Sequence, residues 1–272
     1  MIDYHIHTKL CNHAQGVMGA YVKRAIEKGL KEICFLDHLT ISEPGNRLSM
    51  TLGEVPFYFQ AVQNLKNNFS GVISIKVGLE VDFSSGNTDL VQELIETFSF
   101  DVIGSSLHFP GNIDIVTSSS DWKQGRFNTD YMYELYFSKL KTMLEYDYFD
   151  VICHLDLPKK FGRKPSRVFD KKFDEIITII KDKDLTVELN TSGYNHPVSE
   201  AYPAPDIIKK CHKAGVSMTL GSDAHHPDDV GRHFDRAFTL LQSAGYTHLA
   251  SFTERRRIDI PIEKNEPKTE IK

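Results

Sequence analysis

The sequence predicts an α/β barrel in which parallel strands alternate with helices. Short runs rich in β-branched residues alternate along the chain with longer segments of helical period, which is the pattern of strands joined by crossover helices. The chain has 272 residues, of which 40% are hydrophobic and 25% charged, and single barrels of this class commonly reach that size. We therefore expect one domain spanning residues 1–272, with a polar tail at about 262–272.

Eight segments have the composition of strands, and seven helices are expected between them. The strand candidates are 2–7, 32–36, 72–81, 101–107, 150–154, 185–190, 216–222 and 247–252. The helix candidates are about 17–28, 54–68, 89–98, 129–146, 171–182, 204–214 and 234–244. In the first helix, apolar residues from Val17 to Ile26 recur at helical spacing, and Gly29 follows as a stop signal.

Other local signals mark where later helices begin and where long loops lie. The entry signals are Asn128, Asp170 and, for a third helix, Asp206 or the nearby Pro205. The stretches 41–53 and 109–127 show neither the pattern of a strand nor the helical period. We expect them to be long loops over the functional site or lids that cover it.

Nine potential metal ligands follow the predicted strands. His5 and His7 end the first strand, and because alternate residues of a strand point the same way, their two imidazoles can hold one ion together. The other seven, most of them at the ends of later strands, are His13, His38, Glu80, His108, His154, Asp223 and His225. In a parallel barrel the carboxyl ends of all strands open on one face, where active sites of this architecture lie.

A lone histidine near a strand end is more often a hydrogen-bonded structural residue than a ligand, but the set differs. Without a cation, several imidazoles and two carboxylates in one partly dry site would be buried polar and charged groups without enough partners. The sequence therefore predicts a multinuclear metallohydrolase. Structural roles are expected for the histidines off this pattern, of which His226 is ambiguous: His196, His212, His226, His233 and His248. Asp37 is expected to be a partner of the ligands, and Cys11 and Cys153 ordinary packing residues.

Composition excludes several function classes. The net charge is −5, so the protein has no overall positive potential with which to bind a nucleic-acid backbone. Small anionic substrates are favoured instead. No stretch of about 18 apolar residues and no leader pattern occurs, which predicts a soluble cytoplasmic protein. The four cysteines are widely spaced without a CxxC pair, so reduced thiols are expected. Nothing in the sequence predicts an oligomeric state.

Six motifs spread over the chain resemble those of the polymerase and histidinol phosphatase (PHP) family of metal-dependent phosphoesterases. They are DYHIHT at 3–8, LDH at 36–38, GLEVD at 78–82, SSLHF at 105–109, CHLD at 153–156 and GSDAH at 221–225. The resemblance covers almost the whole chain. It implies a distorted, TIM-like (β/α)7 barrel with the active site at the carboxyl ends of the strands, so one of the eight strand candidates, 247–252, would be short or peripheral.

The resemblance also implies how the ligands are shared among metals. The family usually carries three ions. Position by position, His5, His7, Glu80 and Asp223 correspond to ligands of the first ion, and Glu80 bridges to the second. The second ion would also be held by His108 and His154, and the third by His13, His38 and His225.

Within the family, the chain is most similar to the monofunctional histidinol-phosphate phosphatases, which implies hydrolysis of L-histidinol phosphate. The segment ELNTSG at 188–193 and the run Tyr-Pro-Ala-Pro at 202–205 carry this similarity. One departure concerns substrate binding. Many members have Leu-Arg after the NTSG-like segment, with the arginine a candidate phosphate contact, whereas Tyr194 and Asn195 stand here.

The expected chemistry follows from these ligands. Phosphate monoesters hydrolyse extremely slowly unaided, so heavy charge neutralisation is needed. Two to three divalent ions would supply it, and imidazole and carboxylate ligands accept zinc, iron or manganese. A hydroxide bridging the first two ions would be the nucleophile, with Glu80 setting their separation. Asp223 or His225 could move protons.

Substrate contacts are expected outside the ligand set. The basic run after His154 contains Lys159, Lys160, Arg163, Lys164 and Arg167. Among these Arg163 is the favoured phosphate anchor, and a solvated charged loop is an equal alternative, as it is for Arg126 and Arg232. Asn190 and Asn195 are further substrate-binding candidates.

Two other functions stay open. A nuclease or phosphodiesterase of the same family could act on nucleotides or short oligonucleotides; a DNase-type barrel with a simpler site has no use for His13, His38 and His225. A non-catalytic metal-binding PHP module usually lacks ligands, and here all nine are present.

Overall fold

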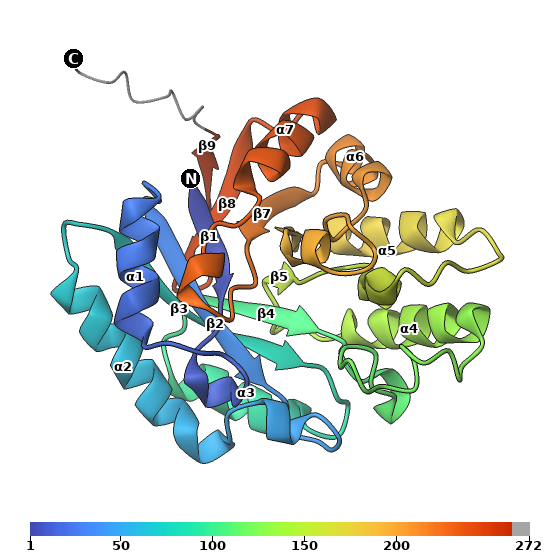
Figure 1. Ribbon diagram of the computed structural model, residues 1–272, viewed down its shortest axis with the longest axis horizontal. Coiled ribbons are helices and arrows are strands. Elements are labelled where there is room, and N and C mark those ends of the chain that lie inside the picture. Colours follow the sequence, from blue (N-terminus) through green and yellow to red (C-terminus); the bar gives the residue numbers. More distant parts are fainter. Residues whose placement is uncertain (263–272) are drawn as a thin grey trace.

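Seven parallel strands form one curved sheet at the centre of the molecule, and their order in the sheet is their order in the chain (Figure 1). The computed structural model describes residues 1–262, so the predicted polar tail lies outside the described residues apart from Ile262. The strands are β1 (Ile2–Ile6), β2 (Glu32–Leu39), β3 (Ser74–Asp82), β4 (Val102–Ser106), β5 (Val151–Ile152), β6 (Thr186–Asn190) and β7 (Ser217–Gly221).

The sheet closes between its first and last strands. The His7 N–H donates to the Ala224 carbonyl at 3.0 Å, and the Ala224 N–H donates to the His5 carbonyl at 3.1 Å, which makes a parallel bridge just beyond the end of β7. The predicted distorted (β/α)7 barrel is confirmed.

Seven helices cover the outside of the barrel, one after each strand (Figure 1). They are α1 (Met18–Glu27), α2 (Val55–Asn68), α3 (Thr88–Thr97), α4 (Thr129–Met143), α5 (Asp170–Asp182), α6 (Pro205–Ala214) and α7 (Phe234–Ala244). Asn128 caps α4 by accepting from the Tyr131 N–H at 2.9 Å. Gly29, with φ of 71°, takes the left-handed conformation that ends α1. Asp170 lies in the first turn of α5, one residue after the cap.

The eighth predicted strand lies outside the barrel sheet. Within residues 1–262, β8 (His248–Thr253) pairs only with β9 (Arg256–Pro261), in an antiparallel hairpin. The peripheral position expected for 247–252 is confirmed. The sequence did not predict β9, whose residues are charged or largely exposed and whose apolar alternation is confined to Ile258 and Ile260. The hairpin contacts residues where barrel strands begin: the Tyr4 hydroxyl bonds to Ser251, and the Lys76 ammonium to Thr253.

Burial on both faces explains the composition of the strands. β3 is buried from Ile75 to Val81, since one face lines the barrel and the other meets helices. Polar side chains therefore gather where the apolar layers end, at the carboxyl ends of the strands. Short 3-10 helices lie in the connections: η1 (Lys9–Cys11), η2 (Asn46–Leu48), η3 (Leu52–Glu54), η4 (Pro110–Asn112), η5 (Leu157–Phe161), η6 (Ser192–Asn195) and η7 (Pro227–Asp229).

Candidate metal centre

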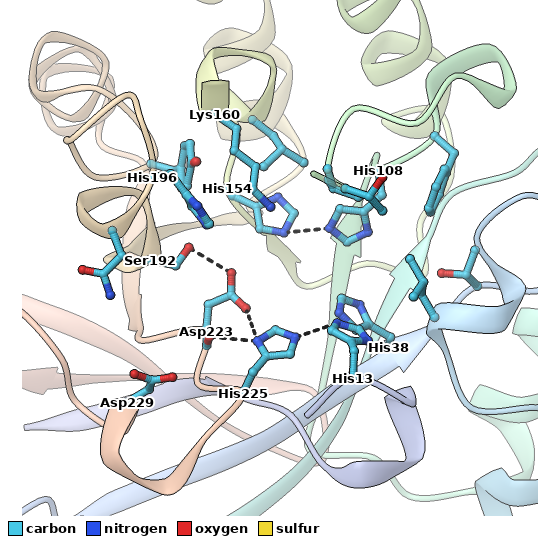
Figure 2. Close-up of a pocket in the computed structure, with 18 of the residues that line it drawn as sticks. His13, His38, His108, His154, Lys160, Ser192, His196, Asp223, His225 and Asp229 are labelled. Atoms are coloured by element: carbon cyan, nitrogen blue, oxygen red, sulfur yellow. Dashed lines mark hydrogen bonds and ion pairs between the residues drawn. The ribbon is translucent and has the colours of Figure 1, made fainter. Parts of the chain in front are cut away.

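The nine predicted ligands converge at the carboxyl end of the barrel. They come from β1, β2 and β3 and from the residues after β1, β4, β5 and β7, and several of them line a cavity of about 460 Å³ (Figure 2). The loops 41–53 and 109–127 supply part of its wall through Leu48, Phe109, Val116 and Thr117. This placement agrees with the expectation that both loops lie over the site.

Glu80 lies at the centre of the cluster. One carboxylate oxygen is 2.7 Å from His154 Nε2 and 3.6 Å from His108 Nε2. The other is 2.7 Å from His38 Nδ1 and 3.4 Å from His5 Nε2. Each oxygen thus faces its own pair of imidazoles, the geometry in which one carboxylate can bridge two ions.

A second group forms around Asp223. Its Oδ1 is 3.1 Å from His7 Nε2 and 3.4 Å from His225 Nδ1. His225 and His13 meet Nε2 to Nε2 at 2.9 Å (Figure 2). The rings of His7 and His38 stack with centroids 4.1 Å apart, so the two groups form one continuous cluster.

The donor set fits cations. His13 Nδ1 lies 2.7 Å from the Cys11 carbonyl and His225 Nδ1 lies 3.1 Å from the Asp223 carbonyl. If each Nδ1 carries the proton donated to its carbonyl, the two facing Nε2 atoms both present lone pairs, which repel unless a cation lies between or beside them. His5 Nε2 and one oxygen of Glu80 are also buried without a hydrogen-bond partner, and a bound ion would satisfy both.

Charge distribution favours the same conclusion. Burial alone would raise the pKa of Glu80, but His38, His5 and His108 hold that pKa well below its ordinary value. Burial, with His7 beside it, lowers the pKa of His225 well below its usual range. Burial opposes protonation of His7, yet its bonds to Asp223 and Asp37 raise its pKa to about 9. Ionised carboxylates thus favour a proton on His7, and a bound cation would replace such a proton.

Two buried carboxylates lie behind the ligands. Asp37 Oδ1 is 3.3 Å from His7 Nδ1, the contact expected of a partner to a ligand. Glu188 Oε1 is 2.6 Å from His5 Nδ1. Sequence reasoning did not single out Glu188, although its place two residues before Asn190 in a strand with a buried face was an available signal.

Of the basic run after His154, Lys160 lines the cavity and Arg163 does not. Lys160 lies in η5, lines the cavity and projects above His154 (Figure 2). Burial lowers the pKa of its ammonium, and Asp223 opposes that shift. Arg163 is not among the lining residues: its guanidinium donates to the Lys123 carbonyl at 2.9 Å and lies over the Trp122 ring. The structure therefore brings Lys160 to the cavity and places Arg163, the residue favoured from the sequence, outside it.

The two asparagine candidates differ in position. Asn190 is fully buried; its amide oxygen accepts from Ser192, and its amide nitrogen donates to Glu188 at 3.1 Å. It therefore contacts protein groups beneath the cavity, not the cavity itself. Asn195 lines the cavity, and its Oδ1 lies 2.7 Å from His233 Nε2.

Three further residues, His196, Arg232 and Cys11, lie at or near the cavity. His196, expected to be structural, lines the cavity, and burial, with Lys160 nearby, lowers its pKa to about 4. Arg232 lines it too, donating to the Ser222 and Asp223 carbonyls. Cys11 is fully buried near His13 and His225, and burial raises the pKa of its thiol to about 12.

Comparison with known proteins places the chain in a family. The PHP domain model matches residues 3–192. A probable histidinol-phosphatase of Deinococcus radiodurans is 33% identical over 90% of this chain and 94% of the relative. The histidinol-phosphatase of Lactococcus lactis is 27% identical over 93% of this chain and 94% of its own length.

Solved structures agree with this placement. The histidinol phosphate phosphatase of Lactococcus lactis, complexed with zinc, L-histidinol and phosphate, has a TM-score of 0.81 and 25% identity, and the match covers 94% of this chain and 98% of that one. A putative histidinol phosphatase of Listeria monocytogenes has the same fold, with a TM-score of 0.79 at 23% identity over 87% and 99% of the two chains. No helix among residues 1–262 is long and apolar enough to cross a membrane. On its motifs, its barrel and these matches, the chain belongs to the PHP domain family.

Proposed function

We propose that the protein is a metal-dependent phosphomonoesterase that hydrolyses L-histidinol phosphate to L-histidinol and phosphate. The carrying observation is that six of the nine predicted metal ligands line one cavity together with the partly buried ammonium of Lys160, while His5, His7 and Glu80 contact that cluster. The names of the relatives and the zinc, L-histidinol and phosphate in the Lactococcus lactis structure support the same substrate.

The charge of the cluster supports two to three divalent ions. Four buried carboxylates lie in or directly behind it: Glu80, Asp223, Asp37 and Glu188. Two divalent cations balance four negative charges, and a third would balance a phosphate dianion. Nitrogen and oxygen donors without thiolate accept zinc, iron or manganese, and the zinc complex of the Lactococcus lactis protein favours zinc.

Bound ions would lower the pKa of a coordinated water and neutralise charge on the phosphoryl oxygens. Glu80, whose two oxygens reach different imidazoles, would hold ions together with those imidazoles. Lys160 binds a phosphate oxygen by a charge-assisted hydrogen bond. Asp223 and His225 lie at the cavity surface, where either can pass a proton to the leaving oxygen of the alcohol.

The rest of the cavity suits a small organic phosphate. About 460 Å³ is within the usual range for a small-molecule pocket. Phe109, Leu157 and Tyr202 give it apolar and aromatic walls, against which an imidazole ring can pack, and Asn195 and Ser192 add polar groups at the rim. We also propose a cytoplasmic location, which the four free, buried cysteines support.

A substrate screen tests this function. Protein reconstituted separately with zinc, manganese or iron is assayed against L-histidinol phosphate, mononucleotides, short oligonucleotides and sugar phosphates. We expect the highest kcat/KM for L-histidinol phosphate. Preference for nucleotides would move the protein to the nucleotide-directed alternative, and no hydrolysis of any substrate by metal-loaded protein would favour a non-catalytic metal-binding module.

A further inference from the structure

β6 contributes none of the nine ligands, yet two of its side chains lie directly beneath them. Glu188 and Asn190 are separated by one residue, so they point to the same side of the strand. Both are almost completely buried, with 1% and 0% of their surface exposed. A buried carboxylate and a buried amide need hydrogen-bond partners. Here several of those partners are predicted metal ligands.

The two oxygens of Glu188 contact residues from three strands. Oε1 is 2.6 Å from His5 Nδ1, at the end of β1. Oε2 accepts from the His154 backbone N–H at 3.0 Å and from the Asn190 amide at 3.1 Å. The same amide nitrogen lies 3.3 Å from Asp223 Oδ2. One carboxylate therefore connects to three predicted ligands, His5 and His154 directly and Asp223 through Asn190.

The contact with His5 decides which of its nitrogens faces the metal centre. With the Nδ1 proton donated to Glu188, Nε2 carries the lone pair. That Nε2 is buried without a hydrogen-bond partner and lies 3.4 Å from Glu80. The carboxylate thus orients the ring and selects the tautomer that can bind a cation.

The backbone at the other two ligands is strained and also held by this pair. His154 and Asp223 have positive φ values of 29° and 55°, a region that residues other than glycine seldom adopt. The Glu188 carboxylate accepts the N–H of His154, and the Asn190 amide reaches the Asp223 side chain. Gly221 leaves room for this arrangement, because a Cβ there would overlap Glu188 Oε1 and lie 2.6 Å from His5 Cβ.

We propose that Glu188 is a positioning residue for the metal centre: it orients His5 and His154, and through Asn190 also Asp223, so that the protein's affinity for divalent cations depends on it. This inference rests on the metal-binding part of the proposed function. Outer carboxylates of this kind typically change metal affinity by about 10- to 100-fold.

Glu188→Gln tests the role with almost no change of shape. In either orientation, the new amide places an N–H₂ group against His5 or against the donors of His154 and Asn190. Wild type and variant are stripped of metal and titrated with zinc chloride in zinc-buffered solutions, and bound zinc is measured by mass spectrometry. We expect the variant to bind zinc about 10- to 100-fold more weakly and to regain most of its kcat when zinc is raised.

Glu32→Gln is the matched control. Glu32 is a partly buried glutamate at the start of β2, where it bonds to the Tyr4 hydroxyl at 2.6 Å, far from the cluster. Both substitutions are expected to lower the Tm of the metal-free protein, but only Glu188→Gln should reduce the rise in Tm on adding zinc. Equal zinc affinity in Glu188→Gln and wild type would overturn the proposal, as would lost activity that excess zinc does not restore.

Glu188→Asp keeps the inference testable if the glutamine variant does not fold. It retains the buried charge but withdraws the carboxylate from His5, so weaker zinc binding is again expected, and unchanged affinity would overturn the proposal. Failure of wild type itself to bind zinc is a separate outcome, which would overturn the proposed metal-dependent function and the inference with it.

Discussion

Two basic residues three positions apart, Lys160 and Arg163, have different surroundings. Gly162 separates them with a φ of 74°, a left-handed turn that ends η5 and reverses the chain. Lys160 is left over the cluster, while Arg163 packs on Trp122 and bonds to the Lys123 carbonyl. An ammonium over the ligands can bind phosphate, and a guanidinium engaged by the neighbouring loop supports that loop.

Lys160→Met should therefore weaken substrate binding. It keeps most of the aliphatic chain and removes the charge, and a lost hydrogen bond to a charged group costs about 1.5–3 kcal/mol, or roughly ten- to more than a hundredfold in kcat/KM. Steady-state kinetics should show a raised KM with unchanged metal content. Arg163→Met is the paired control and should leave kcat/KM close to that of wild type; the reverse result would restore Arg163 as the phosphate anchor.

The lowered pKa of His196 predicts a pH-dependent contribution to stability. Burial holds this pKa at about 4, against an ordinary 6.5. Between these values the unfolded chain binds the proton more strongly, so the contribution of His196 is fully present above about pH 6.5 and is lost as pH falls toward 4. Denaturant unfolding of metal-free wild type and His196→Gln should show wild type losing stability relative to the variant over this window. A constant difference between the two would contradict the prediction.

At the scale of elements, the β8–β9 hairpin is tied to the barrel by charged contacts at its turn. Arg255 donates to both oxygens of Asp150, at 3.0 Å each from Nε and Nη2, and to the Tyr148 carbonyl at 2.9 Å. Asp150 precedes β5, and its carboxylate also accepts the Ile103 N–H. The hairpin therefore stabilises the end of the barrel opposite the metal centre.

Arg255→Ala should destabilise the fold without changing the chemistry. Loss of hydrogen bonds to a charged, mostly buried partner is expected to lower the free energy of unfolding by about 1.5–3 kcal/mol. Arg257→Ala, in the same hairpin, loses bonds to the Asp184 carbonyl and to the Asp184 side chain, which is 73% exposed, and should cost less than about 1 kcal/mol. Chemical denaturation measures the free energy of unfolding of each variant. Equal losses would show that burial of the ion pair does not matter here. A reduced kcat/KM in either variant would contradict the expectation that the hairpin affects stability and not catalysis.

At the scale of the whole molecule, the metal centre joins parts of the chain that are distant in sequence. Its predicted ligands run from His5 to His225, and they meet where β1 and β7 close the barrel. Ions that bind only the folded state stabilise it by mass action, by about 2.7 kcal/mol at a concentration 100 times Kd. Metal binding should therefore stabilise the barrel as a whole.

Chelation and Glu80→Gln should affect stability and turnover together. Removing the ions from wild type should abolish phosphatase activity and lower Tm, because the clustered carboxylates and imidazoles lose their compensation. Glu80→Gln should keep the fold but reduce kcat by orders of magnitude, since a neutral amide bridges cations poorly, and should bind fewer ions per chain. Calorimetry and metal analysis measure both effects, and a fully active metal-free preparation would contradict the metal-dependent function.

The sequence by itself determined the barrel and the gathering of the ligand candidates, because both follow from local patterns. Short runs rich in β-branched residues locate the strands and helical periods locate the helices, and a parallel barrel brings residues after each strand to one face. His5, Glu80 and Asp223, far apart in the chain, could therefore be predicted to meet. Their binding of metal stays a prediction.

The tertiary structure alone decided what depends on packing between distant segments. Local periodicity does not specify the pairing of β9 with β8, the turn that separates Lys160 from Arg163, or the burial of Asn190 under Asp223. Glu188 was overlooked for the same reason: its strand supplies no ligand, and its partners His5 and His154 come from other strands. Periodicity reports which side of an element is buried, whereas the partner of a buried polar group is set by the three-dimensional contacts of the folded chain.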